Sequence, residues 1–352
     1  MTEVYDLVLL GSAGRNQMHR ADGSIEPILG GPLFHSALAT TWSDRRVAVV
    51  TRMAKEDRDL LESLRDASIS VFVSPAPQTT RSHIFYASDN VDDRRHVLET
   101  SAGPFSMADL PPIESRLIHL VGVNRVEFSL GFMLALRDRG LAFSVDMQAL
   151  IRRADPRTGD VTYEDYPHKR QVAAMAEKVK LDIVEAGLLT GTTDLEQAAI
   201  RFEQWGTPEV MVTSADGALV RHEGRTFFER FSNGNDSGRT GRGDTVFAAY
   251  LLRRMDFGAA ESLRFAVALA SIKMESPGPF SGTLADVLDR IDEEQSCGRL
   301  VPRASALRSP GVNTMSSVDE QPRRPPHQRD VDSRIRDGVP RSPCSLLAER
   351  AS

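Results

Sequence analysis

Short apolar runs alternate with helical patterns along most of the chain. Val4–Leu10 and Val47–Arg52 are aliphatic and have the length of buried strands. Helical patterns follow them near Leu33–Thr41 and over Glu56–Arg65. The alternation continues in strand Leu117–Val123, helix Glu127–Arg139, strand Ala142–Met147, strand Leu181–Val184, helix Glu196–Trp205, strand Val210–Thr213 and the hairpin-like stretch Gly217–Phe228. Nearly continuous apolar strands connected by helices predict an α/β fold with a parallel sheet that is covered on both faces.

Residues 69–98 break this alternation. Ile69–Val73, Ser82–Tyr86 and Arg95–Leu98 have strand character, with polar turns and no helical pattern between them. They predict a small β-sheet, which we call the lid, standing off the main sheet. Residues 12–28 are a further candidate for the same small sheet.

The chain changes character near its C-terminal end. Leu263–Met274 is apolar nearly all round and predicts an interior helix, and Leu284–Ile291 predicts a last helix. From residue 296 to residue 352 Pro, Arg, Ser and Gln dominate and no apolar periodicity remains. This tail is expected to be disordered, because it cannot bury enough surface to offset its ordering entropy. The folded domain is therefore expected to span residues 1–295, and a short basic interaction tail is the functional alternative for the rest.

Composition limits the functional classes. The net charge of -6 gives no indication of nucleic-acid binding. Both cysteines, Cys297 and Cys344, lie outside the expected domain, so neither a disulfide framework nor a cysteine metal site is expected. No signal-peptide pattern precedes the first strand and no apolar run has membrane-spanning length, so a cytoplasmic protein without a membrane partner is expected. The absence of a Walker A motif and of a strand-linked Gly-x-Gly-x-x-Gly motif disfavours P-loop kinases and Rossmann dehydrogenases.

The stretch 238–247, Gly-Arg-Thr-Gly-Arg-Gly-Asp-Thr-Val-Phe, carries the clearest chemistry. Gly241 and Gly243 permit a tight turn and a close approach to a ligand, and the apolar run after them predicts a buried helix. Free N–H groups at the start of that helix bind anions, and Arg242 adds a guanidinium there. Asp244 in the first turn suits a general base that takes a proton from a hydroxyl attacking a phosphoryl group. The alternative is a surface turn with Asp244 as a helix cap.

The same stretch resembles the C-terminal signature of the PfkB (ribokinase-like) carbohydrate kinases, Asp-x-Thr-Gly-Ala-Gly-Asp. Thr240, Gly241, Gly243 and Asp244 match this signature, and Phe247 follows. Gly238 stands where the family usually has Asp, and Arg242 where it usually has Ala. The resemblance implies that the family's Asp helps to hold a monovalent cation, so only weak dependence on K⁺ is expected here.

The resemblance implies both a fold and an activity. The fold is a ribokinase-like, doubly wound α/β/α sandwich with a small β-sheet lid. The activity is transfer of the γ-phosphoryl group of ATP, with Mg²⁺, to a hydroxyl of a sugar or other polyol, and a homodimer through the lid is a further expectation. Two alternatives stay open: a nucleoside kinase of the same fold, and a non-catalytic member that binds a ligand and regulates. The departures at positions 16, 182 and 238 favour the second alternative, whereas the intact Gly241-x-Gly243-Asp244 turn speaks against it.

The resemblance also assigns substrate-side residues. Gly30 and Gly31 match the Gly-Gly pair that approaches the sugar in the family, and Asn16 stands where the family has a substrate-binding Asp, with Asp22 as an alternative. The stretch 144–152 resembles an Asp-x-Gln-x-x-x-Arg variant found in a branch with inositol kinase-like proteins. Its candidate substrate residues are Asp146, Gln148 and Arg152, and the lid residues Arg81, Asp92 and Arg94 are weaker candidates.

The donor side is assigned in the same way. Glu185, with Asp182 in place of the usual Asn, resembles the element that positions Mg²⁺ near the phosphates through water. The nucleotide-side candidates are Thr213, Gly217, Thr240, Lys273 and Gly278. Lys273 is alternatively an ordinary lysine that reaches solvent from a helix end.

Overall fold

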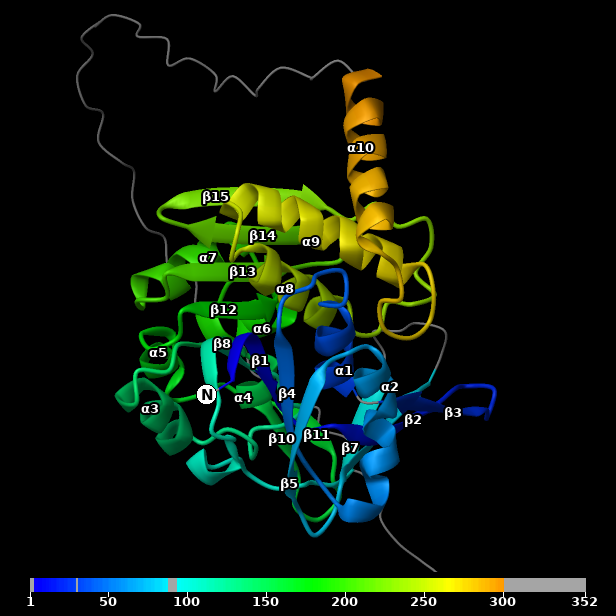
Figure 1. The fold of residues 1–352 in the computed structure, drawn as a ribbon, viewed down its shortest axis with the longest axis vertical. Coiled ribbons are helices and arrows are strands. Elements are labelled where there is room, and N and C mark those ends of the chain that lie inside the picture. The colour runs from blue at the N-terminus through cyan, green and yellow to red at the C-terminus, as the bar shows by residue number, and fades with distance from the viewer. Residues whose placement is uncertain (1–2, 30, 88–93, 301–352) are drawn as a thin grey trace, which may run out of the picture. The chain divides into compact units, whose positions relative to one another are not determined.

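The structure is a computed structural model whose described residues are 3–29, 31–87 and 94–300. In these residues a nine-stranded sheet has the order β15-β14-β13-β12-β9-β8-β1-β4-β5 (Figure 1). Its strands are β1 (Val4–Leu10), β4 (Val47–Met53), β5 (Ser70–Pro75), β8 (Glu114–Leu120), β9 (Phe143–Asp146), β12 (Lys178–Asp182), β13 (Glu209–Thr213), β14 (Gly217–His222) and β15 (Arg225–Arg230). The strands from β13 to β5 are parallel, and β14 and β15 add an antiparallel edge. Because β1 lies between β4 and β8, the chain winds outward in both directions, which confirms the doubly wound α/β prediction.

Helices cover both faces of this sheet. One face carries α1 (Gly31–Leu38), the 3₁₀ helix η1 (Lys55–Leu61), α2 (Glu62–Asp66), α8 (Arg242–Arg253) and α9 (Ala259–Met274). The other face carries α3 (Leu130–Asp138), α4 (Gln148–Ile151), α5 (Lys169–Ala173), α6 (Ile183–Thr190) and α7 (Leu195–Gln204). No helix among the described residues is long and apolar enough to cross a membrane.

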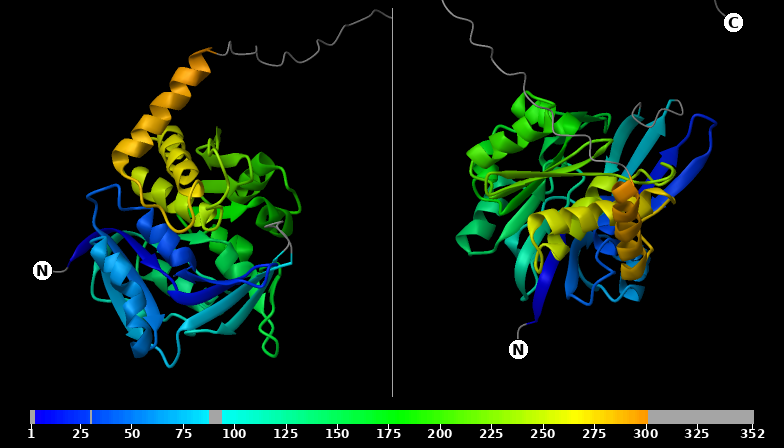
Figure 2. Two further views of the ribbon diagram at one scale, coloured as in Figure 1. Left: turned by 90° about the vertical axis from the view of Figure 1, so that its right-hand side faces the viewer. Right: turned by 90° about the horizontal axis from the view of Figure 1, so that it is seen from above.

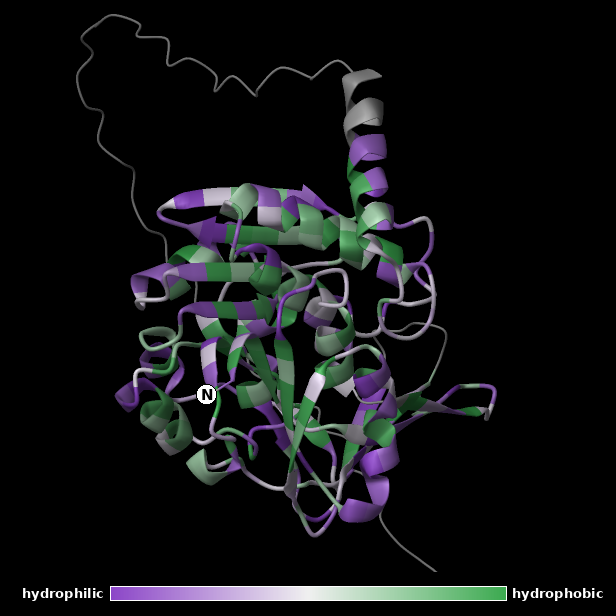
Figure 3. Cartoon of the chain, viewed as in Figure 1, coloured by the Kyte–Doolittle hydropathy of each residue, from purple (hydrophilic) through white to green (hydrophobic). Residues whose placement is uncertain are grey.

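Strand β1 shows why the layers form. Leu7 and Leu9 point into the apolar cluster that contains α8 and α9, whereas Val8 and Leu10 point into the cluster that contains α3 and α7. Successive side chains of a strand point to opposite faces, so a continuous apolar run is buried on both. Figure 3 shows the resulting green centre of the sheet.

The lid differs in part from the prediction. It is a four-stranded sheet of β3 (Ile25–Leu29), β2 (Gly14–His19), β6 (Thr80–Tyr86) and β7 (Arg94–Thr100), and its blue and cyan strands project from the body in Figure 2. Residues 12–28 therefore do contribute to the lid. The assignment of Ile69–Val73 to the lid was wrong, because β5 pairs in parallel with β4 as an edge strand of the main sheet. A short hairpin of β10 (Arg152–Ala154) and β11 (Val161–Tyr163) bridges to β7.

The last helix is longer than predicted. α10 covers Leu284–Leu300 rather than ending near Ile291. Val287 is fully buried and Ile291 packs against the core, which anchors the start of the helix, and the good helix formers Glu293, Glu294 and Gln295 extend it. The predicted disordered tail, apart from residues 296–300, lies outside the described residues.

A buried carboxylate joins the ends of two central strands. Glu127 is fully buried and accepts hydrogen bonds from the backbone N–H groups of Ser12 and Val123, which follow β1 and β8, at 3.2 and 2.9 Å. Burial raises the pKa of Glu127 to about 7, and these hydrogen bonds oppose the rise. The bonds hold the two strand ends at a fixed spacing at the edge where the site described below is formed.

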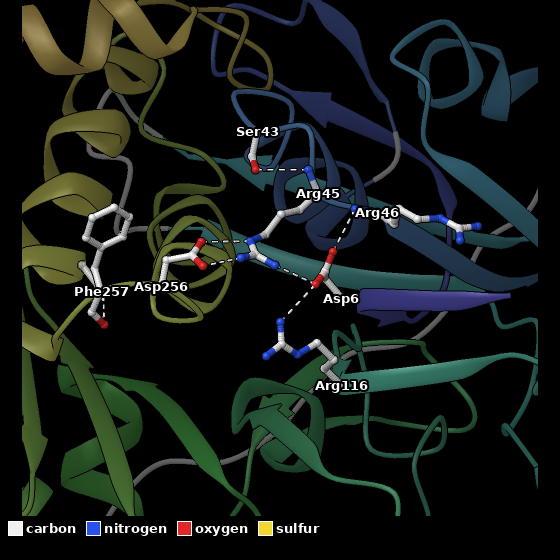
Figure 4. A network of polar contacts seen from close by, with 8 residues as sticks. Asp6, Ser43, Arg45, Arg46, Arg116, Asp256 and Phe257 are labelled. Carbon is white, nitrogen blue, oxygen red and sulfur yellow. Dashed lines mark hydrogen bonds and ion pairs between the residues drawn. The ribbon is translucent and has the colours of Figure 1, made fainter.

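An ion-pair network ties the opposite edge of the sheet together. The Arg45 guanidinium donates to Asp6 at the start of β1 at 2.7 Å and makes a bidentate pair with Asp256 after α8 (Figure 4). Asp6 also accepts from the backbone N–H of Arg46 at 3.1 Å and lies 3.4 Å from Arg116. One guanidinium thus connects the first strand with the turn between α8 and α9.

Arg45→Ala should lower the free energy of unfolding by about 1–2 kcal/mol, because it removes charge-assisted hydrogen bonds from a partly buried network. The matched control is Arg20→Ala, whose pair with Glu26 is about half exposed and lies within one hairpin, and its effect should stay below about 0.5 kcal/mol. Urea unfolding of both variants measures the difference. Equal effects would contradict the structural role of the network.

Candidate active site

The carboxyl ends of the central strands meet the start of α8. Gly241, the residue before this helix, has a left-handed backbone conformation with φ of +80°. A Cβ at this position would lie 2.2 Å from the ring of His35 on α1, so both conformation and packing require glycine. The first N–H groups of a helix have no acceptor within it, so the start of α8 lies where the sequence predicts anion binding.

Asp244 lies in the first turn of α8. Its carboxylate accepts a hydrogen bond from the side-chain amide of Gln148 at 3.1 Å. Burial and the neighbouring charge of Asp146 raise the pKa of Asp244 to about 6, while Lys180, Arg152 and Gln148 oppose the rise. A carboxyl group with this pKa is ionised at neutral pH and still accepts a proton readily, as a general base requires.

A buried ion pair lies beside Asp244. Asp146, the last residue of β9, and Lys180 on β12 are 1% and 4% exposed, and their charged atoms are 3.0 Å apart. The Lys180 ammonium also lies close to Gly243, because a Cβ there would be 2.9 Å from Nζ. Burial opposes the charge of Lys180, but the surrounding carboxylates hold its pKa above the usual value. The sequence analysis did not identify Lys180, since an isolated lysine in a short strand carries no pattern of its own.

The lid and the short hairpin bring two more basic side chains toward Asp244. Arg152 lies with its guanidinium 5.7 Å from the centre of the Tyr163 ring, and its Nε is buried without a hydrogen-bond partner among the described residues. His96 on β7 likewise has a buried Nε2 without a partner in this part of the chain. Burial, with the charges of Arg152 and Arg94, lowers the pKa of His96 to about 3, so its ring is neutral. Buried polar atoms without partners are rare, and a ligand or a water molecule at this place would satisfy them.

Asn16 lies on the lid strand β2, where the resemblance places a substrate contact. It is 9% exposed, and its Oδ1 accepts a hydrogen bond from the hydroxyl of Ser82 on β6 at 2.7 Å. Its Nδ2 lies 3.2 Å from the Cβ position of Gly31 at the start of α1, so Asn16 and Gly31 are brought together. Gly30 lies outside the described residues. The alternative Asp22 lies in the exposed hairpin turn, where it accepts from Ser24.

The weaker lid candidates do not gather in the same place. Arg81 is exposed and lies 3.6 Å from Asp57, on η1. Arg94 is exposed at the start of β7, and Asp92 lies outside the described residues. The structure therefore brings Gln148 and Arg152 close to Asp244, and Asn16 close to Gly31, but leaves Arg81 exposed on the lid.

Glu185 and Asp182 form a reciprocal cap at the start of α6. The Asp182 carboxylate accepts from the N–H groups of Val184 and Glu185 at 2.9 and 2.8 Å, and Glu185 accepts from the N–H of Asp182 at 2.7 Å. Burial raises the pKa of Glu185 to about 8, with Lys180 opposing and Asp182 adding to the rise. The described residues contain no group of three or more potential ligands placed to hold a metal. Mg²⁺ takes one or two carboxylates together with phosphate oxygens and waters, so Glu185 would have to lose its proton to serve as a ligand.

The nucleotide-side candidates lie around the turn after β13 and the end of α9. Thr213 ends β13 and is buried, and Gly217 has no room for a side chain, because a Cβ would lie 2.2 Å from the carbonyl oxygen of Glu229. Gly278 adopts a φ of +94° in the loop after α9. Lys273 does not reach solvent, since it is 2% exposed and its ammonium binds the carbonyl oxygens of Gly238 and Thr240. The interpretation of Lys273 as a solvent-reaching lysine was therefore wrong.

Arg242 lies between the loops that follow β13 and β15. Its guanidinium lies 5.1 Å from the ring centre of Phe231, after β15, and 3.5 Å from the carbonyl oxygen of Ala215, after β13. This places a positive charge beside the turn at Gly241.

The fold has close relatives among solved structures. A pyrophosphate-dependent kinase of the ribokinase family, solved as a sulfate complex, has a TM-score of 0.74 and 28% identity over 81% of this chain and 99% of that chain. A pyrophosphate-dependent kinase of the same family in complex with a pyrophosphate analog and myo-inositol has a TM-score of 0.73 and 27% identity, with the same coverage. Ribokinase from Arabidopsis thaliana, bound to ribose and ATP, has a TM-score of 0.64 at 18% identity over 83% of this chain and 99% of that chain, which shows the fold alone.

No family model matches the sequence, and no curated protein matches it either. The structural likeness agrees with the signature residues Thr240 to Asp244, with the doubly wound sheet and with the four-stranded lid. The chain has the ribokinase-like fold and is similar to the ribokinase-like (PfkB) kinases, phosphotransferases that act on an alcohol group.

Proposed function

We propose that the protein transfers a phosphoryl group from a phosphoanhydride donor to a hydroxyl of a cyclic polyol of the inositol class, with Asp244 as general base. The observation that carries this proposal is the position of Asp244. Asp244 has a pKa of about 6, accepts a hydrogen bond from Gln148 and lies in the first turn of α8, beside the N–H groups proposed to bind the anion.

The proposed reaction balances at these groups. The acceptor hydroxyl gives its proton to the Asp244 carboxylate, and its oxygen forms a bond to the terminal phosphorus of the donor while the anhydride P–O bond breaks. The N–H groups at the start of α8 and the nearby Lys180 ammonium stabilise the charge that develops on the phosphate oxygens. Mg²⁺, held by Glu185 and Asp182 together with donor phosphates, would neutralise further charge.

The polar groups around Asp244 favour a ring with many hydroxyls. Asn16 and Gln148 offer both donors and acceptors, Arg152 offers donors, and the neutral His96 offers one of each. The solved kinase at 27% identity binds myo-inositol, which agrees with this class.

A nucleoside is less well supported, because base recognition uses aromatic stacking. Three phenylalanines that could stack on a base have other contacts. Phe34 is buried in the core, Phe72 packs edge-on against Tyr5, and Phe85 stacks on His19.

Two donors are candidates. ATP is the donor implied by the family signature, and Thr213, Gly217, Thr240 and Gly278 are the residues proposed to line its site. Pyrophosphate is the second candidate, since the kinases at 27–28% identity depend on it. Arg242 favours pyrophosphate, because a guanidinium beside the turn pairs well with a second phosphate, whereas the family usually has Ala there.

The deciding experiment measures phosphorylated product from inositols, sugars and nucleosides with ATP or pyrophosphate and Mg²⁺. Turnover of an inositol above the other acceptors would support the substrate class, and the ratio of kcat/KM for the two donors would identify the donor. Absence of product from every combination would overturn the proposed function.

Asp244→Asn should lower kcat roughly 10²–10⁴-fold, about 3–5 kcal/mol of barrier, because the amide cannot accept the proton. Donor binding should persist or tighten, since a negative charge leaves the neighbourhood of the phosphates. The melting temperature should stay the same or rise slightly, because the raised pKa means that the folded protein disfavours the ionised carboxylate. Asp22→Asn, in the exposed hairpin turn, is the matched control. Near-normal turnover by Asp244→Asn would rule out the base.

The pH profile gives an independent check on the base. With a pKa of about 6 for Asp244, kcat/KM should fall as the pH drops below about 6, because the carboxyl group becomes protonated. Gln148→Leu removes the hydrogen bond that stabilises the carboxylate, so the acid limb should move to higher pH. An acid limb near pH 4 in the wild type, the ordinary range of Asp, would contradict this assignment.

A further inference from the structure

The loop before the anion-binding turn is fastened to the end of α9. The N–H of Gly238 donates to the carbonyl oxygen of Met274 at 2.8 Å, and the hydroxyl of Ser237 donates to that of Glu275 at 3.0 Å. The residues that follow Gly238 lead directly into Gly241 and α8. The position of this loop therefore sets the position of the anion-binding N–H groups.

The buried ammonium of Lys273 also connects this loop to α9. Its side chain is 2% exposed, and its ammonium donates to the carbonyl oxygens of both Gly238 and Thr240. Burial lowers the pKa of Lys273 to about 8, with the nearby Asp244 opposing, so the ammonium is still the main form at pH 7. Its other titratable neighbour is His35. Burial and the charge of Lys273 lower the pKa of His35 to about 3, so the ring is neutral and adds no second positive charge here. Carbonyl oxygens that converge on one point are the ligands that a K⁺ ion also takes.

Position 238 has no room for the aspartate side chain that the family signature usually has there. A Cβ would lie 1.9 Å from the carbonyl oxygen of Ser276 and 2.7 Å from that of Lys273. A carboxylate at position 238 therefore cannot help to hold a free cation in this loop. The same loop instead receives a cation that is covalently part of the chain.

We propose that the Lys273 ammonium is a built-in monovalent cation, which holds the carbonyl groups of Gly238 and Thr240 and so keeps the turn at Gly241 in its anion-binding form without K⁺. Lys273 is thus a positioning residue, acting on the phosphate donor through the loop. The effects of Lys273 on catalysis rest on the proposed kinase function, whereas its effects on cation binding do not.

The first test uses the wild-type protein. Its activity and melting temperature should be the same in K⁺, Na⁺ or tetramethylammonium chloride at equal ionic strength, because the site is already filled. Strong activation or stabilisation by K⁺ over tetramethylammonium would overturn the proposal, and this result does not depend on any variant folding.

The second test compares two variants of one residue. Lys273→Ala leaves space for a small cation, and Lys273→Met fills that space with an apolar chain of similar length. In tetramethylammonium chloride Lys273→Ala should lose roughly 10²-fold in kcat/KM, since a displaced turn costs about that much. Added K⁺ or NH₄⁺ should restore most of this loss in Lys273→Ala but not in Lys273→Met. Lys169→Ala, which removes a lysine paired with Asp165, should show no cation dependence.

Melting curves separate this inference from the proposed function. K⁺ or NH₄⁺ should raise the melting temperature of Lys273→Ala but not that of the wild type, because a ligand that binds only the folded state stabilises it. If the melting temperature of Lys273→Ala depends on the cation but no kinase activity is found, the proposed function is refuted and the cation site is supported. Full activity of Lys273→Ala in the absence of small cations would refute the inference and keep the function.

Discussion

One buried ammonium holds the polar side of the site together. Lys180 is paired with Asp146 at 3.0 Å, and the carboxylates of Asp182, Glu185 and Asp244 also act on its charge. Four carboxylates at the ends of neighbouring elements would repel one another and take up protons if no cation lay among them. Lys180 lets Asp244 remain ionised at neutral pH while burial still raises its pKa. The same charge lies under the first turn of α8, where phosphate oxygens are expected.

The acceptor side depends on contacts between distant parts of the chain. Asn16 and Ser82 come from two strands of the lid, and Gln148 and Arg152 come from the end of β9 and the hairpin after it. The lid is anchored to the body through the Arg15 pairs with Asp57 and Asp59 on η1. A ligand between lid and body would therefore meet groups whose positions are set by two separate sheets. His96 Nε2 and Arg152 Nε, which have no hydrogen-bond partner among the described residues, would be available to such a ligand.

The departures from the family signature have a physical explanation in this chain. Gly238 removes a carboxylate from a place without room for one, and Lys273 supplies the positive charge that the loop carbonyls attract. Arg242 replaces an alanine beside the turn and packs on Phe231. The loop around Gly238 thus has a cation and a close packing of its own in place of the family's carboxylate.

The sequence by itself determined the α/β class and the turn at Gly241–Asp244, because both rest on local rules. A continuous apolar strand is buried on both faces wherever it occurs, and two glycines before an apolar run make a helix start that binds anions. Tertiary structure alone decided the membership of the lid, since Ser70–Pro75 and Thr80–Tyr86 both contain β-branched and aromatic residues and differ in their distant pairing partners. It also decided the roles of Lys180, His96 and Lys273. A lysine or histidine acquires such a role from the carboxylates, carbonyls and buried space around it, and these come from elements far away in the chain.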